Sequence, residues 1–160
     1  MATVYLLTGS NLGDRKKQLE QAATQIDQQA GRITSVSSLY ETAPWGKTDQ
    51  PAFLNQALCI STQQTPQALL ATLLSVEQQM GRVRSTRYGP RVIDIDILLY
   101  DRLVIEEDDL NIPHAELASR RFALLPLAEI AAKHWHPKLH CTIHTLLQQC
   151  RDQSPVQLLG

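Results

Sequence analysis

The sequence has 160 residues, enough for one domain with a full hydrophobic core, so we expect residues 1–160 to form a single domain. With 43% hydrophobic and 19% charged residues it has the composition of a globular protein, and a formal net charge of -1 excludes a general attraction to nucleic acid. No apolar run approaches the roughly 20 residues that cross a bilayer, which favours a cytoplasmic protein with no membrane partner. The three cysteines include no C-x-x-C pair and fit reduced thiols.

The first half of the chain predicts strands and helices in alternation. Apolar runs, helical spacing and turn residues give, in order, a strand, a helix, two strands and a second helix, at residues 4–8, 15–30, 33–40, 53–62 and 66–80. The second helix has the clearest start, because Thr65 is a candidate N-cap and Pro66 suits the first helical position.

The second half begins with a basic loop over residues 82–91, punctuated by Gly89-Pro90. A strand is expected at 92–100, with 103–105 paired to it in a hairpin, and helices around 116–132 and 142–150. The order strand, helix, strand, strand, helix, strand is the ferredoxin-like pattern. We therefore predict an α+β fold with a ferredoxin-like core, an antiparallel sheet flanked by helices, and additional strands and helices at the C-terminal end.

The clearest chemical signal is a pair of aspartates in the run IDIDILL. Side chains at i and i+2 of a strand share one face, so Asp94 and Asp96 point the same way while Ile93, Ile95 and Ile97 enter the core. Two neighbouring carboxylates repel each other unless a cation lies between them, and their hard oxygens suit Mg²⁺. The pattern favours a metal and phosphate site, although the solvated face of an edge strand would give the same residues.

Arginines precede the aspartate pair at positions 82, 84, 87 and 91. Guanidinium groups bind phosphate oxygens through paired hydrogen bonds, so arginines beside metal-binding carboxylates would neutralise a polyphosphate. Loop and strand together indicate phosphoryl transfer, while the arginines alone fit a solvated charge run equally well. The turn GSNLGD lacks the lysine of a P-loop and is better explained as a connection from strand to helix.

Aromatic side chains suggest a site for a flat ring. Trp45, Phe53, Tyr88 and Phe122 lie in or beside loops, and Asn55 at a strand start could pair with ring nitrogens. Each aromatic residue taken alone is more often part of a core. The histidines of residues 134–144 invite a zinc interpretation, which we do not favour because a proline interrupts them and no acid lies nearby.

Seven fragments occur in order over residues 9–130: GSNLGD, YET-x-P-x-G, FLNQA, E-x-x-x-GR-x-R, Y-GPR-x-IDIDILLY, IPH and R-F-x-L-x-PL-x-EI. In these fragments the sequence closely resembles the 6-hydroxymethyl-7,8-dihydropterin pyrophosphokinase family of folate biosynthesis. The resemblance implies that the hydroxymethyl oxygen of the pterin attacks the β-phosphorus of ATP with two Mg²⁺ ions bound, giving the pterin diphosphate and AMP. The implied partners are these two small molecules and no nucleic acid, and a monomer is expected with a dimer left open.

The resemblance also implies roles for single residues. The residues implied in catalysis are Arg82, Arg91, Asp94 and Asp96, of which the two aspartates would hold the metal ions. The nucleotide contacts would come from Glu77, Arg82, Arg84, Ile97, His114 and Arg120. The pterin contacts would come from Thr42, Ala43, Trp45, Phe53, Asn55, Tyr88 and Phe122. The chain departs from the family pattern at Ala43, Phe53, Tyr88 and Ala115, and both aromatic changes keep a ring that can stack.

Two other functions fit parts of the pattern. The phosphoryl acceptor could be a different hydroxylated heterocycle. A ferredoxin-like module could instead use the arginine loop and the aromatic rings to bind RNA, although paired aspartates would repel a phosphate backbone unless a metal is bound. A purely structural role fits least, because three unusual features converge on one short segment.

Overall fold

The computed structural model describes residues 1–42, 51–81 and 92–160. The core elements are β1 (Ala2–Ser10), α1 (Arg15–Gln29), β2 (Arg32–Val36), β3 (Tyr40–Thr42), β4 (Phe53–Thr62), α2 (Pro66–Gln79) and β5 (Asp94–Tyr100). The elements that follow are β6 (Ile105–Glu106), β7 (Asn111–Ile112), η1 (Leu117–Ser119), α3 (Arg121–Ala131), β8 (Trp135–His136), β9 (Cys141–Thr142), α4 (Ile143–Gln149) and β10 (Val156–Leu158). In the described part of the chain, no helix is both long enough and apolar enough to span a bilayer.

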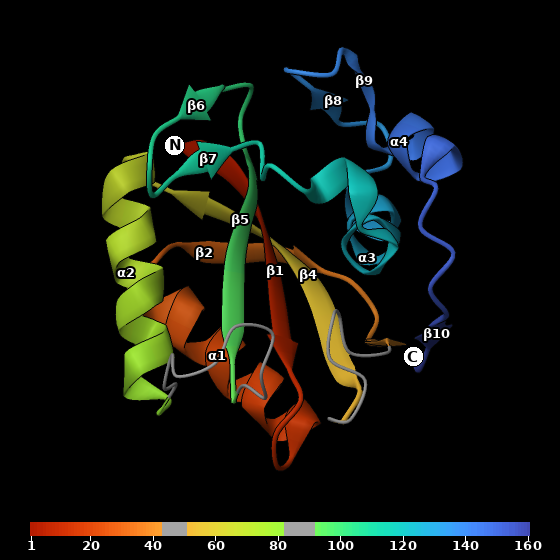
Figure 1. The fold of residues 1–160 in the computed structure, drawn as a ribbon. Helices are drawn as coiled ribbons and strands as arrows, with labels where there is room; N and C mark the ends of the chain where they lie inside the picture. Colours follow the sequence, from red (N-terminus) through yellow and green to blue (C-terminus); the bar gives the residue numbers. More distant parts are fainter. Residues whose placement is uncertain (43–50, 82–91) are drawn as a thin grey trace.

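The main sheet is antiparallel, with the strand order β10-β3-β4-β1-β5 and with β2 also paired to β4 (Figure 1). The central position of β1, between β4 and β5, is the arrangement that a ferredoxin-like core requires. The predicted α+β fold, an antiparallel sheet flanked by helices with further elements at the C-terminal end, is therefore confirmed. Among the strands that the structure describes, β5 pairs in the main sheet with β1 alone, so it forms an edge.

The strand predicted at 33–40 is divided into β2 and β3. Ser37 lies between them, and its hydroxyl accepts the backbone N–H of Ala57 at 2.9 Å while its own N–H donates to the Ala57 carbonyl. The serine side chain thus takes the place of a backbone group in the ladder with β4. The local sequence could not reveal this break, because it depends on a hydrogen bond to Ala57, 20 positions away along the chain.

The hairpin predicted between β5 and residues 103–105 is wrong. Asp101 has a φ of 48°, and its side chain accepts the Thr3 N–H at 2.8 Å while its N–H donates to the Thr3 carbonyl. The end of β5 is therefore fixed to β1, and the chain leaves the main sheet at this turn. Ile105 pairs instead with Ile112, in a separate two-stranded sheet of β6 and β7.

Helices α1 and α2 cover one face of the sheet (Figure 1). Both begin at side chains that accept a backbone N–H, Asp14 from Lys17 and Thr65 from Ala68. The fully or nearly fully buried core on this face contains Leu6, Leu19, Ile26, Ile60, Leu69, Leu73, Ile93 and Ile97. This apolar layer holds the strands that carry the candidate site.

Helix α3 lies on the opposite face and forms a second core with α4 and η1. The residues of this core include Leu7, Leu98, Leu117, Leu124, Leu127, Ile143 and Leu146. The helix predicted around 116–132 is divided into η1 and α3 because Arg120 between them has an extended backbone, with φ of -120° and ψ of 100°. Tyr40 of β3 donates to Glu129 of α3 at 2.6 Å, and burial together with this carboxylate raises the pKa of Tyr40 to about 12.

Candidate active site

A row of residues crosses four neighbouring strands on the α3 face of the sheet. Tyr40 of β3 lies opposite Asn55 of β4, Asn55 opposite Gly9 of β1, and Gly9 opposite Asp94 of β5. Residues that face each other across paired strands share one face. With neighbouring strands about 4.8 Å apart, the backbones of Asn55 and Asp94 are separated by roughly 10 Å across the glycine.

The two aspartates lie on the same face of β5. Both are half-buried, whereas Ile93, Ile95 and Ile97 belong to the core beneath α1 and α2. Asp96 lies opposite Leu7, which packs in the core beneath α3, so the acids point to the α3 side of the sheet. Two carboxylate groups two residues apart on one pleat can bind one cation or two adjacent cations.

Glu77 joins α2 to the strand that carries the acids. Its carboxylate is only 2% exposed as a residue and accepts the backbone N–H of Ile95 at 2.7 Å. Because β5 is an edge strand of the main sheet, this N–H points away from β1, and Glu77 supplies its acceptor. The backbone between Asp94 and Asp96 is thereby held in place. Ile97, the other predicted nucleotide contact on this side, has its side chain in the core.

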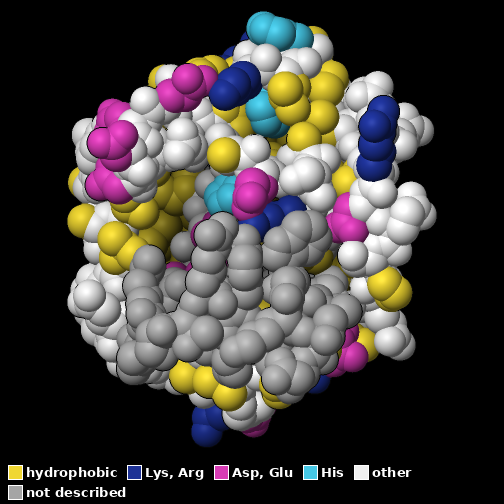
Figure 2. All heavy atoms as spheres, in the orientation of Figure 1, with side chains coloured by type: hydrophobic (Ala, Val, Ile, Leu, Met, Phe, Trp, Pro, Cys, Tyr) yellow, Lys and Arg dark blue, Asp and Glu magenta, His cyan; other side chains and the backbone are white. Residues whose placement is uncertain are grey.

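A cluster of His114, Glu116 and Arg120 adjoins β5. The N–H of His114 donates to the Leu98 carbonyl at 3.0 Å, and its Nδ1 accepts the Glu116 N–H at 3.2 Å. Burial and then the nearby Arg120 lower the pKa of His114, while Glu116 and Asp94 act in the opposite direction. Because Nδ1 is an acceptor, the neutral ring carries its proton on Nε2. Histidine, acidic and basic side chains gather near the middle of this face (Figure 2).

Arg120 bridges this cluster and an aromatic ring. It pairs with Glu116, and its guanidinium carbon lies 5.5 Å from the centroid of the Phe122 ring. Phe122 is half-buried on the first turn of α3. A cation stacked on an aromatic ring is held in orientation by the negative face of the ring. Both residues are therefore placed by the start of the same helix.

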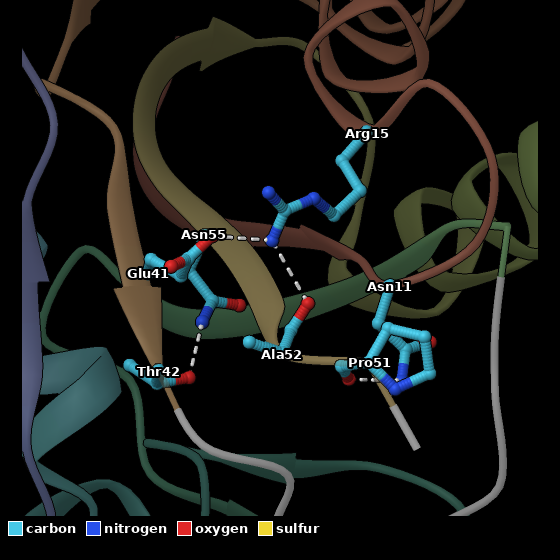
Figure 3. A network of polar contacts seen from close by, with 7 residues as sticks. All are labelled: Asn11, Arg15, Glu41, Thr42, Pro51, Ala52 and Asn55. Atoms are coloured by element: carbon cyan, nitrogen blue, oxygen red, sulfur yellow. Dashed lines mark hydrogen bonds and ion pairs between the residues drawn. The ribbon is translucent and has the colours of Figure 1, made fainter.

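Two predicted pterin contacts, Thr42 of β3 and Asn55 of β4, lie close together (Figure 3). Asn55 is 3% exposed, and its Nδ2 donates to the hydroxyl of Thr42 at 3.2 Å. Thr42 lies opposite Phe53, which is half-buried and two residues from Asn55 on the same face of β4. The structure thus brings an oriented amide and an aromatic ring together at one end of the sheet.

Arg15 and Asn11 contribute a polar network that sequence reasoning missed (Figure 3). Arg15 forms an ion pair with Glu41 at 2.7 Å and donates to the Ala52 carbonyl at 3.0 Å. Asn11 donates to the Pro51 carbonyl at 3.1 Å. These bonds fix the chain on both sides of residues 43–50. The only signal was the GSNLGD turn, whose polar residues we interpreted as a connection.

Several predicted site residues lie outside the described residues, and their roles remain predictions. They are Ala43, Trp45, Arg82, Arg84, Tyr88 and Arg91. A cavity of about 430 Å³ in the described part of the molecule lies between Tyr5 and the end of α3, where Glu129 and His134 also line it. None of the predicted site residues lines this cavity, so it is separate from the aspartate pair.

Comparison with known proteins identifies the family. Residues 5–132 match the family described as 7,8-dihydro-6-hydroxymethylpterin-pyrophosphokinase (HPPK). The chain belongs to this family. All the described residues of the polar row and of the His114 cluster lie within the matched HPPK region.

Curated relatives carry the same description. The chain is 46% identical over 132 residues to a 2-amino-4-hydroxy-6-hydroxymethyldihydropteridine pyrophosphokinase of Methylorubrum extorquens, covering 82% of this chain and 84% of that protein. A protein of the same name from Haemophilus influenzae is 37% identical over 159 residues, covering 99% of each chain. The resemblance and the pyrophosphokinase function predicted from the sequence are confirmed by these matches.

Solved HPPK structures share the fold. The chain superposes on Plasmodium falciparum HPPK-DHPS with a TM-score of 0.75 at 19% identity, covering 92% of this chain. It spans 43% of that longer chain. At this identity the likeness shows the fold alone, and it agrees with the ferredoxin-like order of the main sheet.

Proposed function

We propose that this chain transfers the pyrophosphoryl group of ATP to the hydroxymethyl oxygen of 6-hydroxymethyl-7,8-dihydropterin, with Mg²⁺ held by Asp94 and Asp96. The observation that supports this site most strongly is the placement of two half-buried acids and a buried amide, Asn55, on one face of the sheet. The acids suit a metal-bound triphosphate, and the amide suits a heterocycle. Asn55 and Asp94 are two strands apart in one row, so the two substrates would meet on this face.

The donor set at the acids fits magnesium. Carboxylate oxygens are the ligands that Mg²⁺ prefers, and the ion commonly takes one or two carboxylates and completes its shell with phosphate oxygens and water. The described residues contain no group of three or more His, Cys, Asp or Glu side chains that would bind a metal alone, so a shared site with the substrate is the fitting arrangement. Magnesium bound there would neutralise the triphosphate and favour the departure of AMP. We propose two ions.

His114 and Arg120 would bind the phosphate oxygens of ATP beside the acids. The neutral His114 ring offers its Nε2–H, since Nδ1 is already used by the Glu116 N–H. The Arg120 guanidinium is held by Glu116 on one side and by the Phe122 ring on another. Fixed donors of this kind stabilise charge as it develops on the leaving AMP, because they need not reorient during the reaction.

Asn55, Phe53, Thr42 and Phe122 would bind the pterin. A flat heterocycle stacks on aromatic rings and pairs with an amide along its edge. Thr42 fixes the Asn55 amide before a ligand arrives, so less side-chain entropy is lost on binding. The hydroxymethyl oxygen then attacks the β-phosphorus and loses its proton to solvent as the new O–P bond forms. The bond from the β-phosphorus to the bridging oxygen breaks, and its electron pair leaves with AMP. No covalent intermediate on the protein is part of this proposal.

The remaining parts of the proposal concern location and assembly. We propose that the enzyme works in the cytoplasm and as a monomer. The cytoplasmic location agrees with the three cysteines, all of which are free thiols in the structure. Light scattering of the purified protein would test the monomer, and a mass of two chains would contradict it.

The central test is the conversion of ATP to AMP with and without the pterin. We expect AMP formation to require both 6-hydroxymethyl-7,8-dihydropterin and Mg²⁺, and the Asp96→Ala variant to lose turnover. Arg82→Ala should slow turnover strongly and leave nucleotide affinity nearly intact.

AMP formed with another alcohol but not with the pterin would contradict the proposed substrate. Tight, salt-sensitive RNA binding without Mg²⁺ would favour a binding module instead.

A further inference from the structure

Gly9 occupies the middle of the polar row, between Asn55 and Asp94. It lies near the end of β1 and is paired on both sides, with Asn55 on β4 and Asp94 on β5. Among the described glycines, those with positive φ are Gly13, Gly81 and Gly160, so the backbone of Gly9 does not itself require glycine. The reason for a glycine at this position must therefore be the space that a side chain would fill.

A methyl group at Gly9 would collide with the amide of Asn55. A Cβ built there lies 2.6 Å from Asn55 Oδ1, and 3.7 Å from both Asn55 Cγ and the Phe53 ring. The first distance is far below van der Waals contact, whereas the other two are ordinary contacts. The amide oxygen of Asn55 thus lies directly over the Gly9 backbone, and it does so only because no side chain is there.

The position of the amide is fixed from two sides. Thr42 accepts a hydrogen from Nδ2 at 3.2 Å, and the open face of Gly9 receives Oδ1. Loss of either support would leave Asn55 buried but turned, since a terminal amide rotates over a broad range of angles. We infer that Gly9 is a positioning residue for pterin recognition, which holds the Asn55 amide in the orientation that pairs with the heterocycle. This inference rests on the proposed role of Asn55 in binding the pterin.

A second glycine supplies a matched control. A Cβ at Gly31, between α1 and β2, would lie 2.6 Å from the Ser61 carbonyl oxygen and 2.9 Å from Thr62 Cβ. The distance is the same as at Gly9, but the obstacle is backbone, which cannot turn away. Alanine at Gly31 should therefore disturb the fold, whereas alanine at Gly9 should displace one side chain.

The test compares Gly9→Ala, Asn55→Ala, the double variant and Gly31→Ala. For Gly9→Ala we expect the KM for 6-hydroxymethyl-7,8-dihydropterin to rise about tenfold, the effect of losing one well-placed hydrogen bond. The KM for ATP and kcat should change less than about twofold, because the acids and the phosphate contacts are untouched. Gly31→Ala should lower Tm by roughly 5 °C or more without changing the pterin KM.

The double variant decides whether Gly9 acts through Asn55. When the amide has been removed, the methyl group has space, so Gly9→Ala should not raise the pterin KM further in the Asn55→Ala background. An equal rise in both backgrounds, or an unchanged KM in Gly9→Ala alone, would overturn the inference. If Gly9→Ala does not fold, the double variant should still fold as well as Asn55→Ala. A double variant that also fails to fold would overturn the inference, because Gly9 would then be needed for the fold itself. A wild-type protein that forms no AMP from ATP when the pterin and Mg²⁺ are supplied would overturn the proposed function and this inference together.

Discussion

The two faces of the central sheet are built from the same strands and differ in what they bury. On the face beneath α1 and α2, Leu6, Ile60 and Ile97 are almost completely buried in one apolar core. On the other face the residue types differ along the strands. Apolar residues pack beneath α3, and the row of Asn55, Gly9 and Asp94 follows further along. The apolar face holds the strands rigidly, so the polar face can keep like charges close together without the fold depending on them.

The largest expected effect is on the polar face. Asp94→Ala and Asp96→Ala should each lower kcat/KM by about a thousandfold or more, about 4 kcal/mol of transition-state stabilisation, because a metal-bound triphosphate loses an anionic ligand. The thermal unfolding midpoint should stay near that of the wild type, since both side chains are half-buried on the site face. AMP formation and calorimetry measure the two effects. A large loss of stability with normal turnover would contradict this prediction, because the two acids would then support the fold and not the reaction.

The neighbouring residue should show the opposite behaviour. Ile95→Ala removes a side chain that is 8% exposed and packed beneath the helices, so it should lower the free energy of unfolding by about 2–5 kcal/mol. The backbone that carries Asp94 and Asp96 is unchanged, so the folded fraction should keep its turnover. Urea unfolding would measure the free energy of unfolding, and an active-site titration at low temperature would measure the turnover of the folded fraction. If the folded Ile95→Ala enzyme has a lower kcat that more Mg²⁺ restores, the apolar face affects the metal site and the two faces are not independent.

Glu77 links α2 to β5, the strand that carries both acids, and its removal should have an intermediate effect. Glu77→Ala leaves the Ile95 N–H without its acceptor and should lower the unfolding free energy by about 1–3 kcal/mol. The strand between the acids is then less well held, so kcat should fall as well. Glu77→Gln keeps an acceptor oxygen and is the matched control. If both variants raise the KM for ATP and keep full stability, Glu77 acts by contacting the nucleotide, as the family resemblance implies.

The smallest expected effect is at Arg15. Its pair with Glu41 is about 30% exposed on both sides, and such pairs are worth about 0.5 kcal/mol or less. Arg15→Ala should therefore hardly change stability, but the chain on both sides of residues 43–50 would be held less firmly. We expect a rise of about two- to fivefold in the pterin KM, with Lys16→Ala, an exposed neighbour, as the control. If both variants raise the pterin KM equally, Arg15 has no specific role in holding the chain beside residues 43–50.

Local patterns predicted the main elements and the chemistry of β5. The alternation that placed Ile93, Ile95 and Ile97 in the core also placed Asp94 and Asp96 together, because the side-chain period of a strand is fixed by its pleat. Turn residues and caps located α1 and α2 at Asp14 and Thr65. These features depend on residues adjacent in sequence, so one sequence was enough to find them.

Two errors and one omission share one cause, which is a contact with a distant residue. Ser37 interrupts the expected strand because it bonds to Ala57, and the expected hairpin after β5 fails because Asp101 binds Thr3. The GSNLGD turn gave no sign that Gly9 would face Asn55. In each case the decisive partner is at least 20 positions away in the sequence.

The sequence by itself determined the family, the α+β class and the pair of acids on one pleat, since repeated local spacing and ordered motifs carry that information. Only the tertiary structure decided that Asn55, Gly9 and Asp94 form one row and that Glu77 accepts the Ile95 N–H at the edge of β5. Strand register depends on the hydrophobic pattern of each strand and on tight turns between strands, but β1, β4 and β5 are separated along the chain by α1 and α2. Neighbours across strands therefore cannot be read from the order of residues along the chain.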